Sequence, residues 1–171
     1  MSGPPPHPRA DNEVKEPVTV AVVDHRAPSD VGEWPARIEA LAPAALAAAW
    51  RERTGDAVPL AALDALDVAL LDDAAIGQVH AEFLAAPAPT DVITFDHGEI
   101  LLGTETIARQ AAAHAEPFGR ELLRCFIHGL LHLAGHRDDT PDARAQMARA
   151  QEQIVEDLWP AGGAGPASRV V

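Results

Sequence analysis

The sequence predicts a single α/β (α+β) domain in which a small mixed four-stranded sheet packs against about five helices. Short apolar runs typical of strands alternate with helical patterns over the first two thirds of the chain, and three helical patterns then follow one another. A chain of 171 residues is long enough to form one sizeable hydrophobic core. These observations favour a sheet surrounded by helices.

The two ends of the chain differ in composition from the part between them. Residues 1–16 contain the run Gly3-Pro4-Pro5-Pro6 and few apolar side chains, which predicts a disordered tail. Residues 160–171 begin with a run rich in Gly and Ala and predict a flexible C-terminal tail. We therefore expect one folded domain over residues 17–159.

The first strand and the first helix follow directly from residue patterns. Residues 18–23 are apolar and rich in β-branched side chains, as in a strand. Residues 34–53 have a helical pattern, and Gly55 follows as a stop. Pro43 is expected to break or restart this helix, because proline lacks the amide N–H that a continuous helix uses.

A second strand and its helix come next. Residues 66–71 predict the strand, after which Asp72 and Asp73 can cap a helix that runs to about Leu84. The remaining elements are a loop over 85–89, strands over 91–95 and 99–102 joined by a turn at His97-Gly98, and helices over 105–115, 117–134 and 141–159, the last capped by Thr140.

The segment from residue 128 to residue 138 predicts a metal site. His128 and His132 are four residues apart, so on a helix they lie about 40° apart around the axis and one turn along it, and both imidazoles can reach one ion. Gly135 is placed to end the helix in a left-handed conformation. The chain would then turn back and bring Asp138 to the ion as the third ligand.

Three other interpretations of this segment are less favoured. His136 and Asp139 compete with Asp138 as third ligand, although we rank both lower. A histidine pair packed in the core is disfavoured, because buried imidazoles without partners are costly. Zinc peptidases of the H-E-x-x-H type use the glutamate after the first histidine as general base, and here that position is Gly129. The motif therefore indicates a metal site of another kind.

Two segments resemble a known family. Residues 128–135 (His-Gly-Leu-Leu-His-Leu-Ala-Gly) resemble the H-G-x-L-H-L-x-G signature of the YbeY-type rRNA maturation factors, a family of metal-dependent bacterial endoribonucleases. Residues 89–95 (Pro-Thr-Asp-Val-Ile-Thr-Phe) are similar to its P-T-D-V-L-S-F segment, and residues 102–107 more loosely to its L-G-D-I-x-I strand. The two main motifs in the right order are more specific than either alone.

Two positions depart from the family pattern. The family commonly has a histidine as third ligand where this chain has Asp138, and a carboxylate can serve zinc there. The family usually has an arginine, implicated in catalysis, five residues before the proline of P-T-D-V, and Leu84 stands there in this chain. A leucine cannot bind phosphate, so the resemblance supports metal binding more strongly than ribonuclease chemistry.

The resemblance implies a zinc-dependent endoribonuclease that hydrolyses RNA phosphodiester bonds in ribosomal RNA maturation and ribosome quality control. His128, His132 and Asp138 would hold one Zn²⁺, or another divalent ion, whose open position acts as a Lewis acid or activates water. The implied partners are ribosomal RNA and the small ribosomal subunit or its assembly proteins, with neither DNA nor membrane. Two alternatives stay open: a non-catalytic ribosome-assembly factor with a structural metal, and a zinc hydrolase of a non-RNA substrate.

Four further side chains are candidates for the cleft beside the metal. We expect Arg137, inside the metal loop, to contact a phosphate, and Asp91 to assist catalysis. Thr94 and His97 belong to the third strand and its turn, which could form the opposite wall. Their alternative roles are capping for Asp91 and His97 and ordinary strand packing for Thr94.

The composition sets outer limits on function. A net charge of −13 is unusual for an RNA-binding protein, although residues 100–160, which carry the motif, are nearly balanced, with 9 acidic and 6 basic side chains. The single cysteine, Cys125, excludes an internal disulfide, fits a reducing compartment and is expected to pack in the core. No apolar run could span a bilayer and no signal sequence is apparent, so we expect a cytoplasmic protein.

Overall fold

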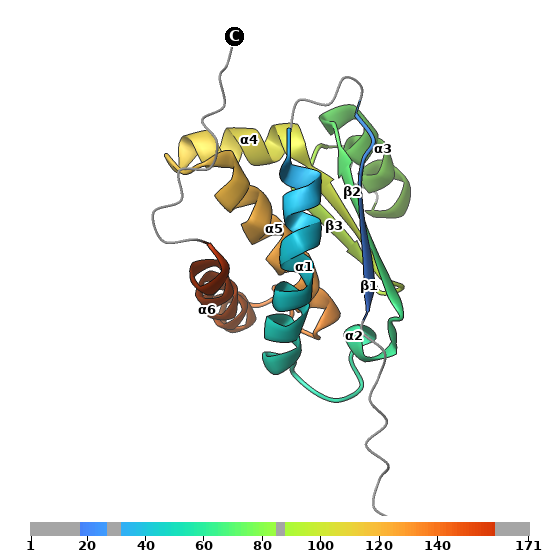
Figure 1. The fold of residues 1–171 in the computed structure, drawn as a ribbon, viewed down its shortest axis with the longest axis vertical. Coiled ribbons are helices and arrows are strands. Elements are labelled where there is room, and N and C mark those ends of the chain that lie inside the picture. The colour runs from blue at the N-terminus through green and yellow to red at the C-terminus, as the bar shows by residue number, and fades with distance from the viewer. Residues whose placement is uncertain (1–17, 27–31, 85–87, 160–171) are drawn as a thin grey trace, which may run out of the picture.

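The computed structural model describes residues 18–26, 32–84 and 88–159, and it shows one four-stranded sheet in them (Figure 1). The strands are β1 (Thr19–Asp24), β2 (Ala65–Leu71), β3 (Val92–Phe95) and β4 (Glu99–Gly103), in the order β1-β2-β4-β3. The first, second and fourth run parallel, while β3 pairs antiparallel with β4 and forms one edge. The predicted mixed α/β fold is confirmed.

Six helices accompany the sheet in the described ranges. They are α1 (Trp34–Arg51), α2 (Pro59–Ala62), α3 (Asp73–Leu84), α4 (Thr104–Ala113), α5 (Phe118–Leu133) and α6 (Pro141–Leu158). The five expected helices are present, and the four-residue α2 was not predicted. None of these helices is both long enough and apolar enough to cross a membrane. The predicted tails over 1–16 and 160–171 lie outside the described residues, so the domain boundaries stay a prediction.

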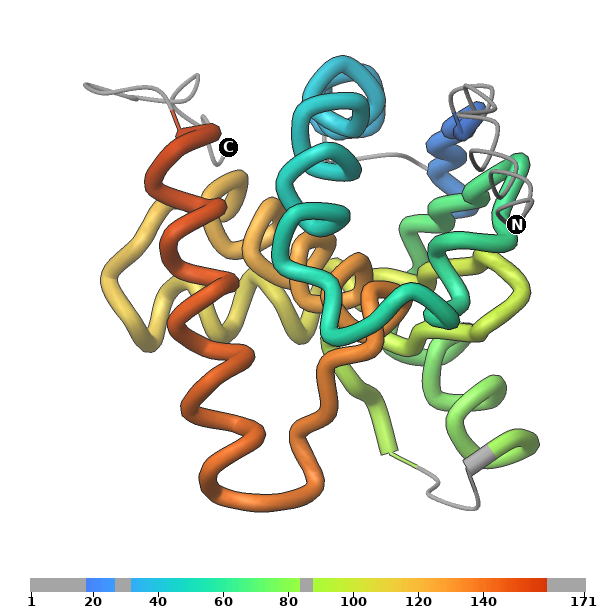
Figure 2. Tube along the Cα trace, turned by 90° about the horizontal axis from the view of Figure 1, so that it is seen from below, coloured from blue at the N-terminus to red at the C-terminus, as the bar shows by residue number. Residues whose placement is uncertain are grey.

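The sheet separates two cores of unequal size. Leu66, Val68 and Leu70 of β2 point into the larger one, which α1, α5 and α6 cover. The alternate residues Ala69 and Leu71 point into the smaller one, which α3 covers. This alternation is the period of two that a strand imposes on its side chains. Figures 1 and 2 show α3 on one side of the sheet and the remaining long helices on the other.

The helix that carries the histidines lies at the centre of the larger core. α5 contacts α1, α4, α6 and the strands β3 and β4. Its residues Leu122, Phe126 and Leu130 are 0% exposed. Cys125 is buried too, as predicted, and its burial raises the pKa of the thiol. A helix held on so many sides gives its side chains little freedom, which suits a precise site.

One prediction about the first helix is wrong. α1 runs without interruption through Pro43. Pro43 is exposed, as is Glu39 one turn before it, whereas Ile38, Ala42 and Ala45 on the other face are buried. The carbonyl that loses its helical hydrogen bond therefore lies on the solvent side, where water can satisfy it. Packing of the buried face outweighs the local cost of the proline.

Three local signals in the sequence are confirmed. Asp72 caps α3 by accepting a hydrogen bond from the Ala75 N–H through Oδ1, at 2.7 Å. Thr140 caps α6 in the same way, accepting from the Ala143 N–H at 3.2 Å. Gly98, in the turn between β3 and β4, has φ +96°, a conformation that favours glycine.

Candidate metal centre

The end of α5 has the geometry that the glycine predicted. Gly135 has φ +92°, and its N–H donates to the His132 carbonyl at 2.9 Å. The next N–H, of His136, donates to the Leu131 carbonyl, also at 2.9 Å. This pair of hydrogen bonds is a Schellman cap, which closes a helix and reverses the chain. Residues 136–140 can therefore fold back toward the helix.

The side chains of His128, His132 and Asp138 converge beside this turn. The two histidine Nε2 atoms are 3.1 Å apart, and Asp138 Oδ2 lies 3.9 Å from the first and 3.8 Å from the second. All three donor atoms fall within 4.8 Å of one another. Tetrahedral zinc bonds of about 2.1 Å need donors roughly 3.4 Å apart. The structure thus brings the three predicted ligands together as a group that could hold a metal ion.

The hydrogen bond made by Nδ1 of each histidine determines that its Nε2 atom faces the other two candidate ligands. His132 Nδ1 lies 3.2 Å from the backbone carbonyl of His136, which can only accept, so this Nδ1 carries the proton. His128 Nδ1 lies 2.9 Å from Gln151 Oε1. The orientation of that amide is fixed in turn, because its NH₂ donates to Glu152 Oε1 at 3.2 Å. Both Nδ1 atoms are donors, and both Nε2 lone pairs face each other.

This arrangement fits a cation. Two lone pairs at 3.1 Å and a nearby carboxylate repel one another unless a positive charge lies among them. Burial and the neighbouring His128 imidazole lower the pKa of His132 below its ordinary value, which keeps the ring neutral as a metal ligand must be. Two nitrogens and one carboxylate oxygen form a ligand set typical of zinc sites.

The two rival ligands are engaged elsewhere. His136 is 5% exposed, and its Nε2 lies 2.7 Å from the Glu52 carbonyl at the end of α1. Asp139 accepts two hydrogen bonds from the Arg137 guanidinium, at 2.7 and 3.0 Å. Among the described residues the group that could hold a metal ion therefore has three members, His128, His132 and Asp138.

The segment after α1 clamps the turn that follows α5. The Thr54 N–H donates to the Ala134 carbonyl and its hydroxyl to the Gly135 carbonyl, both at 3.0 Å. With the contact between His136 and Glu52, three hydrogen bonds join segments about eighty residues apart in the chain. The metal loop is thus held by tertiary structure as well as by its own cap.

Gly129 is closely packed and leaves no room for a general base. A Cβ at this position would lie 2.9 Å from both Ile100 Cδ1 and Thr94 Oγ1, closer than side chains tolerate. A glutamate of the peptidase type could enter only if the side chains of Ile100 and Thr94, or α5 itself, shifted. The packing therefore agrees with the sequence in excluding the H-E-x-x-H mechanism.

A cleft of about 730 Å³ opens beside the group. Edge strand β3 and the metal loop form its walls, so the third strand and this loop lie together as expected; the lining includes Phe83, Thr94, Phe95, His132, Arg137 and Asp138. Thr94 Oγ1 is buried and has no hydrogen-bond partner in the described part of the chain. This hydroxyl is a polar group that a ligand in the cleft could satisfy.

Two predicted cleft residues lie outside this lining. Asp91 accepts hydrogen bonds from the Val92 N–H at 2.9 Å and from the Gln110 amide at 3.2 Å, so both its oxygens hold the start of β3. His97 is exposed in the turn and lies 3.3 Å from Glu99. Leu84 is the last residue of α3, and its side chain lies outside the described part of the structure.

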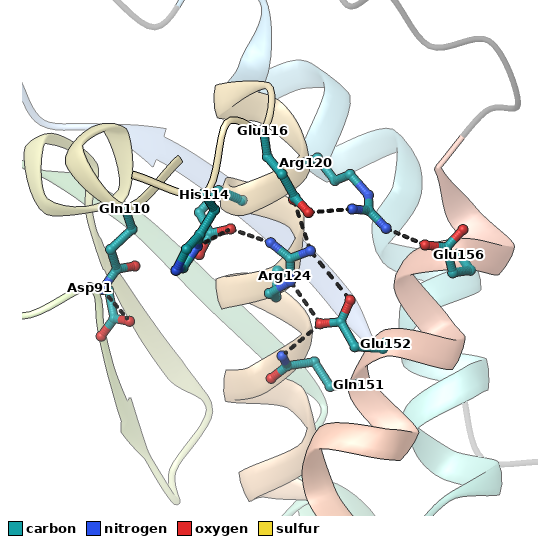
Figure 3. A network of polar contacts seen from close by, with 10 residues as sticks. Asp91, Gln110, His114, Glu116, Arg120, Arg124, Gln151, Glu152 and Glu156 are labelled. Atoms are coloured by element: carbon teal, nitrogen blue, oxygen red, sulfur yellow. Dashed lines mark hydrogen bonds and ion pairs between the residues drawn. The ribbon is translucent and has the colours of Figure 1, made fainter. Parts of the chain in front are cut away.

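A polar network behind His128 was not foreseen from the sequence. Gln151 Oε1 lies 2.9 Å from His128 Nδ1. The Gln151 amide in turn donates to Glu152, whose carboxylate accepts from Arg124 Nε at 2.7 Å (Figure 3). Arg124 also pairs with Glu116 and with the buried Glu121. A glutamine on a helix 23 residues away carries no sequence signal of this role. This chain of contacts orients the His128 ring through its Nδ1 atom, on the side away from the other two candidate ligands.

Gln151→Leu is expected to weaken metal binding roughly 10- to 100-fold, as loss of such supporting partners commonly does. The substitution removes the acceptor that holds His128 Nδ1–H, so the ring can turn and present the wrong nitrogen. Competition with a chelator measures the affinity. Gln153→Leu, an exposed position on the same helix, is the matched control. Equal affinities in both variants would show that Gln151 does not orient the ring.

Comparison with known proteins agrees with the geometry. The family model described as Endoribonuclease YbeY matches residues 33–159. Endoribonuclease YbeY of Rhodopirellula baltica is 36% identical over 145 residues, which cover 76% of this chain and 71% of the relative. The protein of the same name from a Chelativorans species is 32% identical over 142 residues, covering 74% and 84%.

A solved structure shows the same fold. The solution structure of TM1509 from Thermotoga maritima matches with a TM-score of 0.56 over 87% of this chain and 99% of that one, at 24% identity. That identity supports the fold alone, while the family model and the two relatives cover most of the folded region. The chain belongs to the YbeY endoribonuclease family.

Proposed function

We propose that this protein is a zinc-dependent endoribonuclease that hydrolyses RNA phosphodiester bonds during ribosomal RNA maturation. The observation that carries the proposal is the convergence of His128, His132 and Asp138 at an open cleft in a chain of the YbeY family. The relatives' name supports the reaction class. Ribosomal RNA, the small ribosomal subunit with its assembly proteins, and a cytoplasmic location are proposed on the same basis.

The ligand set supports a catalytic rather than a structural metal. Structural zinc normally has four protein ligands, whereas catalytic zinc has three and an open position. His136 and Asp139, the nearest candidates for a fourth ligand, hold other partners. The carboxylate of Asp138 is half exposed, so the open side of the group faces solvent. When bound, zinc would act there as a Lewis acid and would lower the pKa of a water ligand toward ~7.

The chain's own residues contribute positioning and charge. Arg137 is 74% exposed and pairs with Asp139 in water, where such pairs are weak and exchange readily. We propose that its guanidinium leaves Asp139 and binds a phosphate of the substrate in bidentate fashion. Asp91 would act through β3, whose start it holds, and so would position the cleft wall without touching RNA.

Cleavage of a small-subunit rRNA precursor tests the proposal. We expect the zinc-loaded protein to cut it, and His128→Ala protein from the same preparation to lose the activity, because one of three ligands is gone. Equal cleavage by both proteins would identify the activity as a contaminant. A wild type that carries zinc and leaves the RNA intact would favour the assembly-factor alternative, consistent with Leu84 in place of the family's arginine.

A further inference from the structure

Two aromatic rings lie in the same cleft as the metal group. Phe83, at the end of α3, and Phe95, at the end of β3, line it together with His132 and Asp138. Their ring centroids are 5.5 Å apart and their planes meet at 78°, an edge-to-face contact. The ring of His97 stacks on Phe95 at 5.4 Å and extends the series to the β3–β4 turn.

Phe83 is much more exposed than a core residue. Val79 and Ile76, one and two turns earlier on the same side of α3, pack in the smaller core. Phe83 continues their apolar stripe beyond that core, and 62% of its surface is exposed. Leaving so much of a phenyl ring in water forgoes stabilisation that burial would supply. A ligand that covers the ring would recover it.

The charges of the cleft indicate what kind of ligand could cover the Phe83 ring. Its described lining includes three carboxylates, of Asp96, Asp138 and Asp139, and one arginine, Arg137, which is paired. With a net charge of −13, the protein gains little affinity for RNA from neutralised phosphates. Stacking of bases on aromatic rings is the other main source of affinity for unpaired nucleic acid, and it tolerates any base.

We propose that Phe83, supported edge-on by Phe95, is a stacking subsite for an unpaired nucleobase of the RNA substrate. The inference rests on the proposed function and deepens it by naming how the substrate is held. A base on Phe83 would place the adjoining phosphate in the cleft that His132 and Asp138 also line. A base inside a duplex offers no free face, so this subsite accepts only nucleotides outside helices.

Binding of a short oligoribonucleotide, about eight nucleotides of mixed sequence, tests the subsite. We expect Phe83→Leu to raise its Kd roughly 5- to 100-fold, because leucine is apolar but has no ring face. Phe83→Tyr keeps the ring and should stay within about twofold of the wild type. Trp50→Leu, an exposed aromatic of α1 outside the cleft lining, should leave the Kd unchanged. Phe83→Trp adds a fluorescent reporter to the three native tryptophans, so a stacked base should quench this variant more than it quenches the wild type.

The outcomes separate the two proposals. Zinc content near one per chain in each variant shows that the metal group is intact. If Phe83→Leu then binds the oligoribonucleotide as tightly as the wild type, or RNA quenches Phe83→Trp no more than it quenches the wild type, the stacking subsite is wrong while the ribonuclease proposal stands. If the wild type neither binds nor cleaves RNA, both are wrong.

Discussion

Asp138→Ala is expected to lower the affinity for zinc by more than about 100-fold, because even the loss of a supporting partner outside the ligand set costs roughly 10- to 100-fold. The substitution leaves two imidazoles whose lone pairs face each other without the carboxylate beside them. Elemental analysis after dialysis should find about one zinc per wild-type chain and almost none in the variant. Cleavage of RNA should fall with the metal.

Asp139→Ala is the control for that experiment. Asp139 lies next in the chain and is similarly exposed, but its carboxylate binds Arg137. Zinc content should therefore stay at the wild-type level. If Asp139→Ala lost the metal and Asp138→Ala kept it, the third ligand would be Asp139, and the positions of the ligands relative to the family motif would have to be reassigned.

Arg124→Met is expected to lower the free energy of unfolding by about 3 kcal/mol, the scale seen when one partner of a buried ion pair is removed. Glu121 is 4% exposed and contacts Arg124, and Glu116 and Glu152 share the same guanidinium (Figure 3). Burial opposes the charge on Arg124, yet these carboxylates raise its pKa above the ordinary value. Without the arginine, the buried Glu121 carboxylate keeps only the exposed His114 imidazole, 4.0 Å away, as a basic neighbour.

Urea unfolding at neutral pH measures this loss, and two further variants interpret it. Arg109→Met breaks an ion pair with Asp73 whose arginine is 61% exposed, so it should cost about 0–1 kcal/mol. Adding Glu121→Leu to Arg124→Met should restore much of the stability, because the stranded charge is gone. A loss below about 1 kcal/mol for Arg124→Met alone would mean that water reaches Glu121 and screens it.

The sequence predicted most of the fold because its strands and long helices follow local rules. Alternating apolar residues mark β2, and Asp72 and Thr140 mark the starts of two helices. The four-residue α2 is too short for a periodic pattern. The prediction that Pro43 breaks the first helix was wrong, because the effect of a proline depends on which face of α1 meets solvent. The local rule for proline does not include that.

The site also contains residues that the sequence could predict and residues that it could not. His128, His132 and Asp138 could be predicted because a helical spacing and a glycine break bring them together within one short segment. Gln151 and Phe83 could not, because Gln151 meets His128 through the packing of α6 on α5, and Phe83 lines the cleft through the packing of α3 on the sheet. Long-range contacts of this kind leave no periodic trace in a single sequence.

The clamp between Thr54 and the turn at Gly135 links two parts of the fold energetically. Any ion that binds the folded protein and not the unfolded chain stabilises it by mass action. Part of that stabilisation passes to the end of α1, because the hydrogen bonds of Thr54 and Glu52 exist only while the turn is in place. An ion bound at His128, His132 and Asp138 would thereby reduce how often this region opens, and so how readily proteases cleave the protein.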